Sequence, residues 1–295
     1  MSPLVELLSE VIGVGAPLLI AAAYLKRAHT LAAEGRPVPH WRQLSFAIGI
    51  VVIALAVGGP IEGYATKLVL AHMVQHLLLA DLASLLLVLG LTGPLLRPIL
   101  ALPVGRYLRF LAHPVVAITV FTANLFLWHV PALYQAVTTS VPLHELEHLS
   151  FIATGCLLWM PLFGPMPTPS WFGKGAHVVY AAGIWLPAMV LANVLMWAGS
   201  GFYPHYAASA EELGIAPVAD QSTAGAILMA WCTVLALSLF AWAFLRWARE
   251  DSERQDLLDL ADAQGFELSS ERAERAVAAG RGAVLRERIE TAHKR

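Results

Sequence analysis

The stretch LVLAHMVQHLLLADLASLLLVLG, residues 68–90, predicts a helix that crosses a membrane. Asp81 is its one charged residue, and at about 1.5 Å per residue the stretch is long enough to span about 30 Å of hydrocarbon. His72 and His76 lie one helical turn apart near its start. Because ionisable side chains at membrane depth usually face a protein interior or an aqueous cavity, the two histidines indicate a functional surface on this helix.

The composition of the whole chain is that of a polytopic membrane protein. Hydrophobic residues make up 58% of the 295 positions and charged residues only 14%. The mean hydropathy is +0.64, which is higher than a soluble core of this length needs. The formal net charge of −2 gives no indication of a nucleic-acid partner. Cys156 and Cys232 stand in apolar runs without a CxxC motif, so we expect no disulfide framework.

Six further apolar stretches are long enough to cross the membrane, so the predicted fold is all-α, with seven transmembrane helices. The predicted spans are residues 8–25, 43–60, 68–90, 113–134, 144–164, 176–198 and 223–247. Basic residues follow the first, third, fifth and seventh spans, whereas Lys67 is the one basic residue of the opposite connections. The positive-inside rule therefore predicts an N-terminus outside and a C-terminus in the cytoplasm.

We expect two parts, a transmembrane domain at 1–248 and a polar cytoplasmic helical tail at 249–295. From about residue 249 the chain is rich in Asp, Glu, Arg, Gln and Ala. Gly265 predicts a break in the tail, and the run that starts at Ser269 is typical of a helix N-terminus. The tail is either a solvated segment or a docking element. At the other end, no Lys or Arg precedes Lys26, so we expect the N-terminus to be retained rather than cleaved as a signal peptide.

Five histidines are predicted to lie at one depth. His72 and His76 start a span that runs inward, His129 lies in the final turns of an outward span, and His144 and His148 start the next inward span. At about 1.5 Å per residue, all five fall in a layer roughly 10 to 12 Å thick beneath the outer surface. Pro131 is expected either to loosen the last turn beside His129 or to mark the end of that helix.

Angular position groups these residues further, because helical residues three and four apart share one face. Two segments read His-x-x-(Gln/Glu)-His, and their polar residues are His72, Gln75 and His76 in the third span and His144, Glu147 and His148 in the fifth. The stripe of the fifth span continues through Phe151, Gly155 and Trp159, a mixture that suits packing against other helices. We therefore expect both faces to point into the bundle.

Such a cluster is suited to a transition metal, because imidazole is a ligand for copper and zinc. A helix N-terminus disfavours the imidazolium form, which leaves neutral nitrogens for coordination. Glu147 could offset the charge of the ion and Gln75 could orient a ligand, while Met73 could supply a thioether for Cu(I). Any single histidine is more often a hydrogen-bonded interfacial residue than a ligand. His205 belongs to an outer loop that could cover the site.

Residues 144–148, His-Glu-Leu-Glu-His, also match the short motif of zinc peptidases. In that alternative His144 and His148 would hold zinc, Glu145 would act as the base, and a third ligand would come from elsewhere. Asp220 is the candidate from a later span, but Asp220-Gln221-Ser222-Thr223 is more typical of a helix cap. The motif leaves the other histidines unexplained. A haem-binding redox protein and a scaffold that binds no metal are further alternatives.

Several segments together resemble the caa3-type cytochrome c oxidase assembly factors, the CtaG family of seven-helix bacterial membrane proteins. The resemblance covers residues 10–247 and rests on residues 72–79, Trp128 to Tyr134, His144 and His148 followed by Trp159 to Leu162, and Asp220-Gln221 leading to Trp231. It implies a non-enzymatic role in the maturation of haem-copper oxidases in the bacterial cytoplasmic (inner) membrane. It also implies that copper is handled on the outer side and delivered to an oxidase subunit.

We therefore expect a copper-binding assembly factor in which five histidines hold the metal as Cu(I), with zinc as the alternative ion. The predicted ligands are His72, His76, His129, His144 and His148, and the predicted supporting residues are Gln75, Glu147, Met73 and Asp220. Five imidazoles exceed the usual needs of one ion, so two adjacent sites or a transfer path are possible. The expected partners are an oxidase subunit, an extracytoplasmic copper donor and the lipid bilayer.

Overall fold

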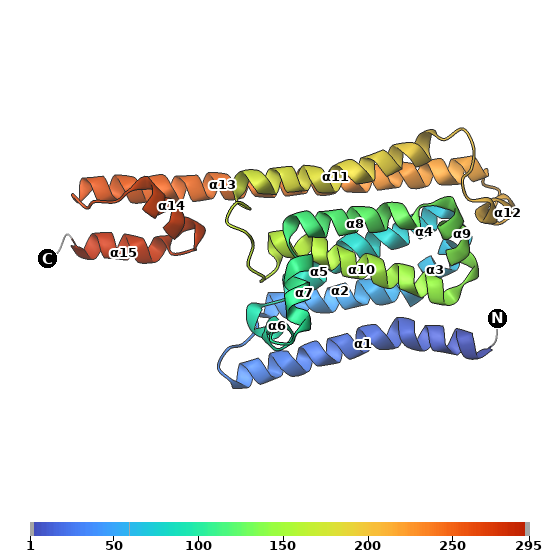
Figure 1. Cartoon of the computed structure of the whole chain (residues 1–295), viewed down its shortest axis with the longest axis horizontal. Helices are drawn as coiled ribbons and strands as arrows, with labels where there is room; N and C mark the ends of the chain where they lie inside the picture. Colours follow the sequence, from blue (N-terminus) through green and yellow to red (C-terminus); the bar gives the residue numbers. More distant parts are fainter. Residues whose placement is uncertain (1–2, 59, 293–295) are drawn as a thin grey trace. The chain divides into compact units, whose positions relative to one another are not determined.

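The computed structural model describes residues 3–58 and 60–292 and contains helices but no strand among them (Figure 1). This confirms the predicted all-α class. The chain divides into two compact units, residues 1–236 and 237–295, and each is described here by itself. Within the described residues both cysteines are free thiols.

The first unit is a bundle of long helices with short helices between them (Figure 1). Its elements are α1 (Pro3–Ala33), α2 (His40–Gly58), α3 (Pro60–Ala65), α4 (Val69–Leu77), the π-helix η1 (Leu78–Ala83), α5 (Ser84–Gly90), α6 (Gly93–Leu100), α7 (Val104–Leu111), α8 (Pro114–Trp128), α9 (Pro131–Thr139), α10 (Val141–Phe163), α11 (Lys174–Trp197), α12 (Pro204–Glu212) and the start of α13 (Pro217–Ala263). The short helices α3, α4, α9 and α12 gather at one end of this unit (Figure 1).

Five segments among the described residues are long and apolar enough to cross a membrane. They are α2, the run Val69–Gly90 that contains α4, η1 and α5, then α10, α11 and α13. The pair α7 and α8, bent by 81°, adds a sixth if it is counted as one span. These apolar helices are typical of a membrane protein. The count of seven spans and the orientation of the termini remain predictions from the sequence.

Close packing between the third span and α10 sets the position of the polar end. Gly155 of α10 faces Ser84, and a methyl group at Gly155 would come within 2.7 Å of the Ser84 Oγ and closer still to the Ala80 carbonyl. The single hydroxyl proton of Ser84 lies within hydrogen-bond reach of two carbonyls, since Oγ is 2.8 Å from the Leu79 oxygen and 3.1 Å from the Ile152 oxygen. Small residues thus let two backbones approach within a bilayer, where apolar side chains alone give little drive for association.

The π-helix η1 interrupts the third span directly after its histidines. Asp81, which lies in η1, is buried and accepts a hydrogen bond of 2.9 Å from Trp231 Nε1 of α13. On α10, the buried Phe151 and Trp159 confirm that the face of the fifth predicted span that carries His144 and His148 points to the interior. π-helical turns are rare and frequently occur near functional sites.

Two expectations about helix ends were wrong. The predicted span at 113–134 is not continuous, because α8 ends at Trp128 and α9 begins at Pro131. Proline disfavours helical backbone in the residue before it, and Val130 is extended with ψ 125°. Pro131 therefore occupies the first turn of a new helix, where its missing N–H costs nothing, instead of kinking the last turn of the old one.

Asp220 is likewise not the cap of its own helix. It lies in the first turn of α13, and its carboxylate accepts hydrogen bonds from the backbone N–H groups of Val69, at 2.7 Å, and Leu70, at 3.0 Å. It therefore caps α4, the helix that carries His72 and His76. A carboxylate at this position satisfies two of the free N–H groups and complements the helix dipole.

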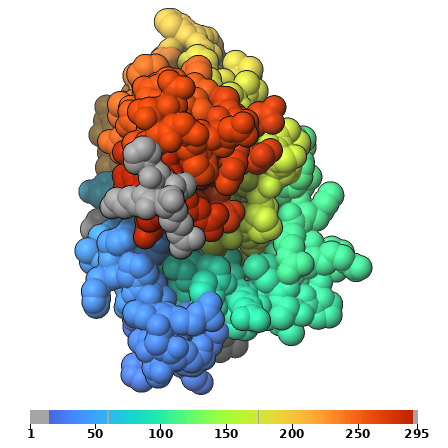
Figure 2. Space-filling model, turned by 90° about the vertical axis from the view of Figure 1, so that its left-hand side faces the viewer, coloured from blue at the N-terminus to red at the C-terminus, as the bar shows by residue number. Residues whose placement is uncertain are grey.

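The second unit contains the end of α13, α14 (Ser270–Ala278) and α15 (Gly282–Ala292). Its apolar core consists of Leu257, Ala261, Val277, Leu285 and Ile289. The predicted break and cap are confirmed, since Gly265 has φ +63° and Ser269 Oγ accepts a hydrogen bond from Arg272 N. Figure 2 shows the exposed face of this unit in orange and red.

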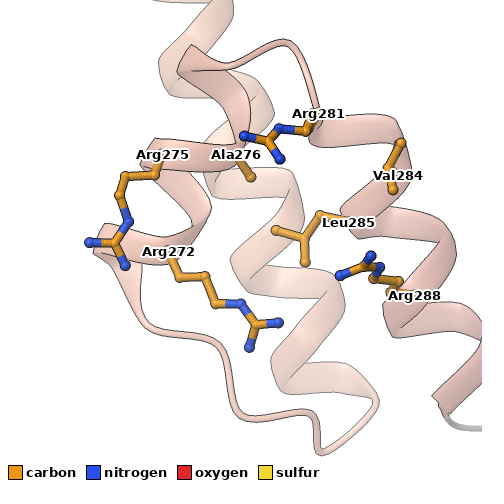
Figure 3. Close-up of a pocket in the computed structure, with 7 residues that line it drawn as sticks. All are labelled: Arg272, Arg275, Ala276, Arg281, Val284, Leu285 and Arg288. Atoms are coloured by element: carbon orange, nitrogen blue, oxygen red, sulfur yellow. The ribbon is translucent and has the colours of Figure 1, made fainter.

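A basic pocket of about 290 Å³ lies between α14 and α15 (Figure 3). Arg272 and Arg275 come from α14, Arg281 from the connecting turn and Arg288 from α15. Acidic side chains are not among the described residues that line it. The pocket is therefore positive, although acidic residues outnumber basic ones in the segment from residue 249 onward.

Candidate metal centre

The two histidines of α4 and the two of α10 lie close together inside the first unit, and His129 at the end of α8 lies beside them. Neighbouring imidazole rings have centroids 4.2 Å apart for His144 and His148, 4.3 Å for His72 and His76, and 5.5 Å for His72 and His144. His76 lies 6.1 Å from both His129 and His148. The structure thus brings all five predicted ligands into one cluster.

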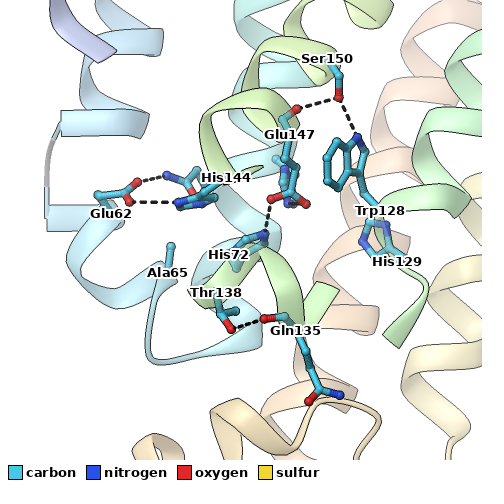
Figure 4. Close-up of polar contacts among 12 residues, drawn as sticks. Glu62, Ala65, His72, Trp128, His129, Gln135, Thr138, His144, Glu147 and Ser150 are labelled. Atoms are coloured by element: carbon cyan, nitrogen blue, oxygen red, sulfur yellow. Dashed lines mark hydrogen bonds and ion pairs between the residues drawn. The ribbon is translucent and has the colours of Figure 1, made fainter. Parts of the chain in front are cut away.

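Glu147 contacts both histidines of α4, and Figure 4 shows its side chain beside His72. Its Oε2 is 3.4 Å from His72 Nε2, and its Oε1 is 3.2 Å from His76 Nε2. Neither carboxylate oxygen has a hydrogen-bond partner among the residues that the structure describes. A buried carboxylate is stable only when a charge or hydrogen bonds compensate it, and here either a proton shared with the facing imidazoles or a bound metal ion would do so.

Tyr206 of α12 determines which nitrogen of His72 faces Glu147. The Tyr206 hydroxyl donates a hydrogen bond to the Ala65 carbonyl, at 3.1 Å, and lies 3.2 Å from His72 Nδ1. Since the hydroxyl has one proton, this network assigns a proton to Nδ1, which donates to the hydroxyl oxygen. In the neutral ring the lone pair of His72 Nε2 then faces Glu147 Oε2 at 3.4 Å, where a metal ion or a second proton on the ring would join the two.

His129 has the same tautomer for a related reason. Its Nδ1 lies 2.7 Å from the Leu125 carbonyl, and because a carbonyl only accepts, Nδ1 carries the proton and Nε2 has the lone pair. The backbone leaves the helical conformation at His129, which is the C-cap of α8. The hydrogen bond to Leu125 fixes the ring orientation as an outer-shell partner fixes a metal ligand.

The cluster holds an unusual number of buried polar atoms without a hydrogen-bond partner inside the described parts of the chain. The imidazole atoms are His72 Nε2, His76 Nδ1 and Nε2, His129 Nε2, His144 Nε2, and His148 Nδ1 and Nε2. Each such atom normally costs about 1–3 kcal/mol. Two ligands of one tetrahedral ion, each about 2.0–2.2 Å from it, lie about 3.3–3.5 Å apart. The spacing of Glu147 and the α4 histidines therefore fits a shared ion.

Glu62 is the residue that the sequence analysis missed. It belongs to the short helix α3, its Oε1 lies 3.7 Å from His144 Nδ1, and its Oε2 accepts a hydrogen bond from Gln75 Nε2. Burial raises the pKa of Glu62, against the effects of the Gln75 hydrogen bond and of His72. The sequence did contain an indication of this residue, because Glu62 is the one carboxylate between the second and third predicted spans.

Other predicted residues have different places. Gln75 donates to Glu62 and to the Ala56 carbonyl, at 2.8 Å, so it links the cluster to α2 and α3. Met73 is buried next to His72 in sequence, about 100° around α4. His205 is exposed, and its neighbour Tyr206, also in α12, is the residue that reaches the cluster. Burial raises the pKa of Tyr206, so its hydroxyl keeps its proton.

A pocket of about 240 Å³ adjoins the cluster and gives it an opening. Its lining residues include Glu62, Glu145, His72, His144 and Tyr206, together with residues 137–141. Figure 4 shows Glu62 and Glu147 on either side of His144. The opening therefore leads from a carboxylate-bearing mouth to the buried histidines.

Two groups of three residues place their ligand atoms within 4.8 Å of one another. One group is Glu62, His144 and His148, and the other is His72, His144 and Glu147. Each combines two imidazoles with one carboxylate, a donor set that suits copper or zinc better than calcium or magnesium. The unpartnered nitrogens and the buried carboxylate are thus consistent with a transition metal.

Comparison with known proteins identifies one matching family. A family described as "Cytochrome c oxidase caa3 assembly factor" matches residues 22–250 of this chain. Two curated relatives, uncharacterized proteins of Mycobacterium bovis and Mycobacterium tuberculosis, are each 24% identical over 172 residues.

The aligned region is 52% of this chain and 26% of each relative, so this chain spans about a quarter of the length of the curated relatives it matches. No solved structure matches.

Proposed function

Because this chain belongs to the family of caa3-type cytochrome c oxidase assembly factors, we propose that it assists oxidase assembly by holding copper in its buried histidine cluster and delivering it to an oxidase subunit. The ligands are drawn from His72, His76, His129, His144 and His148, with Glu147 as the carboxylate. The family supports the assembly role. The histidine cluster is what supports copper as the bound metal.

One observation carries the proposal: Glu147 is buried between two imidazole nitrogens, and neither oxygen has a hydrogen-bond partner among the described residues. A protein pays several kcal/mol to bury such a group without compensation. A bound cation would neutralise the carboxylate and accept the facing lone pairs together. Imidazole binds copper in both oxidation states, while the harder carboxylate oxygens favour a divalent ion, so Cu(I), Cu(II) and Zn(II) are all to be tested.

The membrane arrangement that fits this function has seven spans, namely α1 in addition to the six segments counted above. The protein would lie in the bacterial inner membrane with its N-terminus outside and its C-terminus in the cytoplasm. The basic residues that follow alternate spans favour this direction. In it, the histidine cluster opens to the extracytoplasmic side, where a copper donor and the copper-binding part of an oxidase subunit could both reach it.

The test is metal analysis of the purified chain in detergent after loading with Cu(I), Cu(II) or Zn(II). We expect wild type to retain copper and both His72→Ala/His76→Ala and His144→Ala/His148→Ala to lose it. His205→Ala, which alters an exposed histidine, is the matched control and should bind as wild type does. In a strain that lacks the gene, oxidase copper content should fall. Wild-type protein without copper, or an oxidase with normal copper in that strain, would refute the proposal.

A zinc peptidase is the second candidate, and Glu62 is the observation that favours it. The candidate third ligand in the sequence, Asp220, instead caps α4, but Glu62 lies with His144 and His148, and Glu145 lines the same pocket. Two histidines and a glutamate are the ligand set of several zinc peptidases. This reading leaves Glu147 and the α4 histidines without a role. Cleavage of a membrane substrate that Glu145→Gln abolishes would support it.

A further inference from the structure

The two groups of ligand atoms overlap at one residue, His144. We infer that the metal moves through the cluster in two steps, from an outer position formed by Glu62, His144 and His148 to an inner position formed by His72, His144 and Glu147. This inference rests on the proposed function, because it concerns the route of the same ion.

The depth of the two carboxylates gives the direction of the route. The Glu62 side chain is 32% exposed and His144 is 14% exposed, whereas His72 is 2% and Glu147 is 0% exposed. Glu62, His72 and His144 line the pocket beside the cluster, whereas Glu147 and His148 are not among its described lining residues. The two carboxylates, rather than the imidazoles, therefore distinguish the outer position from the inner one. An ion from outside therefore meets the Glu62 position first.

Charge at the mouth favours the capture of a cation. Glu62 and Glu145 both line the pocket, and carboxylates around a cleft raise the local concentration of positive ions. Gln75 holds Glu62 in place through its Nε2 hydrogen bond. Because Gln75 lies between His72 and His76 on α4, the outer carboxylate is tied to the helix that supplies the inner ligands.

His144 is the ligand that the two positions share. Its Nδ1 lies 3.7 Å from Glu62 Oε1, and its Nε2 is buried without a hydrogen-bond partner in the described chain. Because the lone pairs of the two ring nitrogens point apart, one nitrogen can stay bound to the ion only if the imidazole ring turns from the Glu62 side to the His72 side, where a bond to His72 or Glu147 replaces the bond to Glu62. The exchange needs no change in the oxidation state of the ion, and the ion stays coordinated throughout.

The inference predicts that Glu62 and Glu147 affect different quantities. Glu62 lies on the route but not in the final position, so Glu62→Gln should slow loading and release by the same factor, about tenfold or more, and change affinity less than threefold. Glu147 is a ligand of the final position, so Glu147→Gln should lower affinity about tenfold or more while loading changes less than threefold. A charge-assisted contact is worth a change of about this size.

The experiment follows the transfer of Cu(I) from a chromogenic chelator to the full chain in detergent by stopped flow, with release measured by excess chelator. Glu212→Gln removes an exposed acid of α12 and is the control for net charge. Intrinsic tryptophan fluorescence confirms that each variant is folded. Loading of Glu62→Gln at the wild-type rate, or equal slowing by Glu212→Gln, would overturn the two-step route while copper binding stands. Wild-type protein that takes up no metal would instead refute the proposed function and the route with it.

Discussion

Replacement of Glu147 by glutamine should change metal affinity and the stability of the metal-free protein in opposite directions. The substitution keeps the shape of the side chain and removes its charge. In the loaded protein it deletes one charged ligand, and a charge-assisted contact of about 1.5–3 kcal/mol corresponds to a loss of about 10- to 150-fold in affinity. In the metal-free protein it deletes a buried carboxylate that faces His72 and His76 at 3.4 and 3.2 Å.

The stability effect follows from desolvation. A buried charge that no ion or hydrogen bond compensates carries a large desolvation cost, and its replacement by a neutral side chain of similar shape removes that cost. We therefore expect a higher Tm for metal-free Glu147→Gln than for metal-free wild type, and a smaller increase in Tm on addition of copper, because ligand stabilisation depends on affinity. Glu145→Gln changes the same charge two residues away at a pocket-lining position and should leave the affinity for copper within about threefold.

The assay combines copper titration against a competing chelator with thermal unfolding followed by tryptophan fluorescence, for which the chain has nine reporters. Unchanged copper affinity in Glu147→Gln, or a metal-free protein less stable than wild type, would show that the carboxylate is a structural hydrogen-bonding group. The reasoning about a cation between Glu147 and the imidazoles would then be wrong.

Three further substitutions test the surroundings of the cluster. Tyr206→Phe removes the hydroxyl that accepts from His72 Nδ1–H and should lower copper affinity about tenfold, as loss of an outer-shell partner commonly does, measured by the same titration. Gly155→Ala should lower Tm strongly and abolish copper binding, because its methyl group would collide with the Ser84 side chain and the Ala80 carbonyl. The control is Gly63→Ala, whose methyl group meets no atom within 4 Å and which should change neither quantity. Asp220→Ala should destabilise the protein by about 0.5–2 kcal/mol through loss of the α4 cap, and Asp220→Asn should restore most of that in thermal unfolding.

Much of the cluster could be predicted from the sequence, because the helical period and depth alone align the histidines. His72 and His76, and likewise His144 and His148, share a face by spacing, and each pair lies near the start of a predicted span. These two rules need no knowledge of tertiary structure. They bring the rings together in the folded chain, as the ring distances show.

Glu62 and Tyr206 could not be found in this way, because they come from short helices between the spans. Neither periodicity nor hydropathy fixes where a six-residue helix such as α3 places its side chains. The break at His129 was missed for a related reason, since the apolar pattern continues from α8 into α9. The misplaced cap at Asp220 shows a limit of local motifs, because its carboxylate serves an N-terminus about 150 residues away.

A constant offset between the third span and α10 explains how the fold builds the site. Residue 76 lies beside residue 148, and residue 72 beside residue 144. Further along, the Cys156 thiol contacts the Ser84 carbonyl with the same separation of 72 positions. The two helices therefore run parallel and in register from the histidines to the contact at Gly155. A slip by one residue would rotate one set of ligands by about 100°, and a slip by one turn would shift it by about 5.4 Å, more than the 4.8 Å within which the ligand atoms gather. Because the glycine contact fixes this register, the packing deep in the bundle and the geometry of the metal centre depend on the same few small residues.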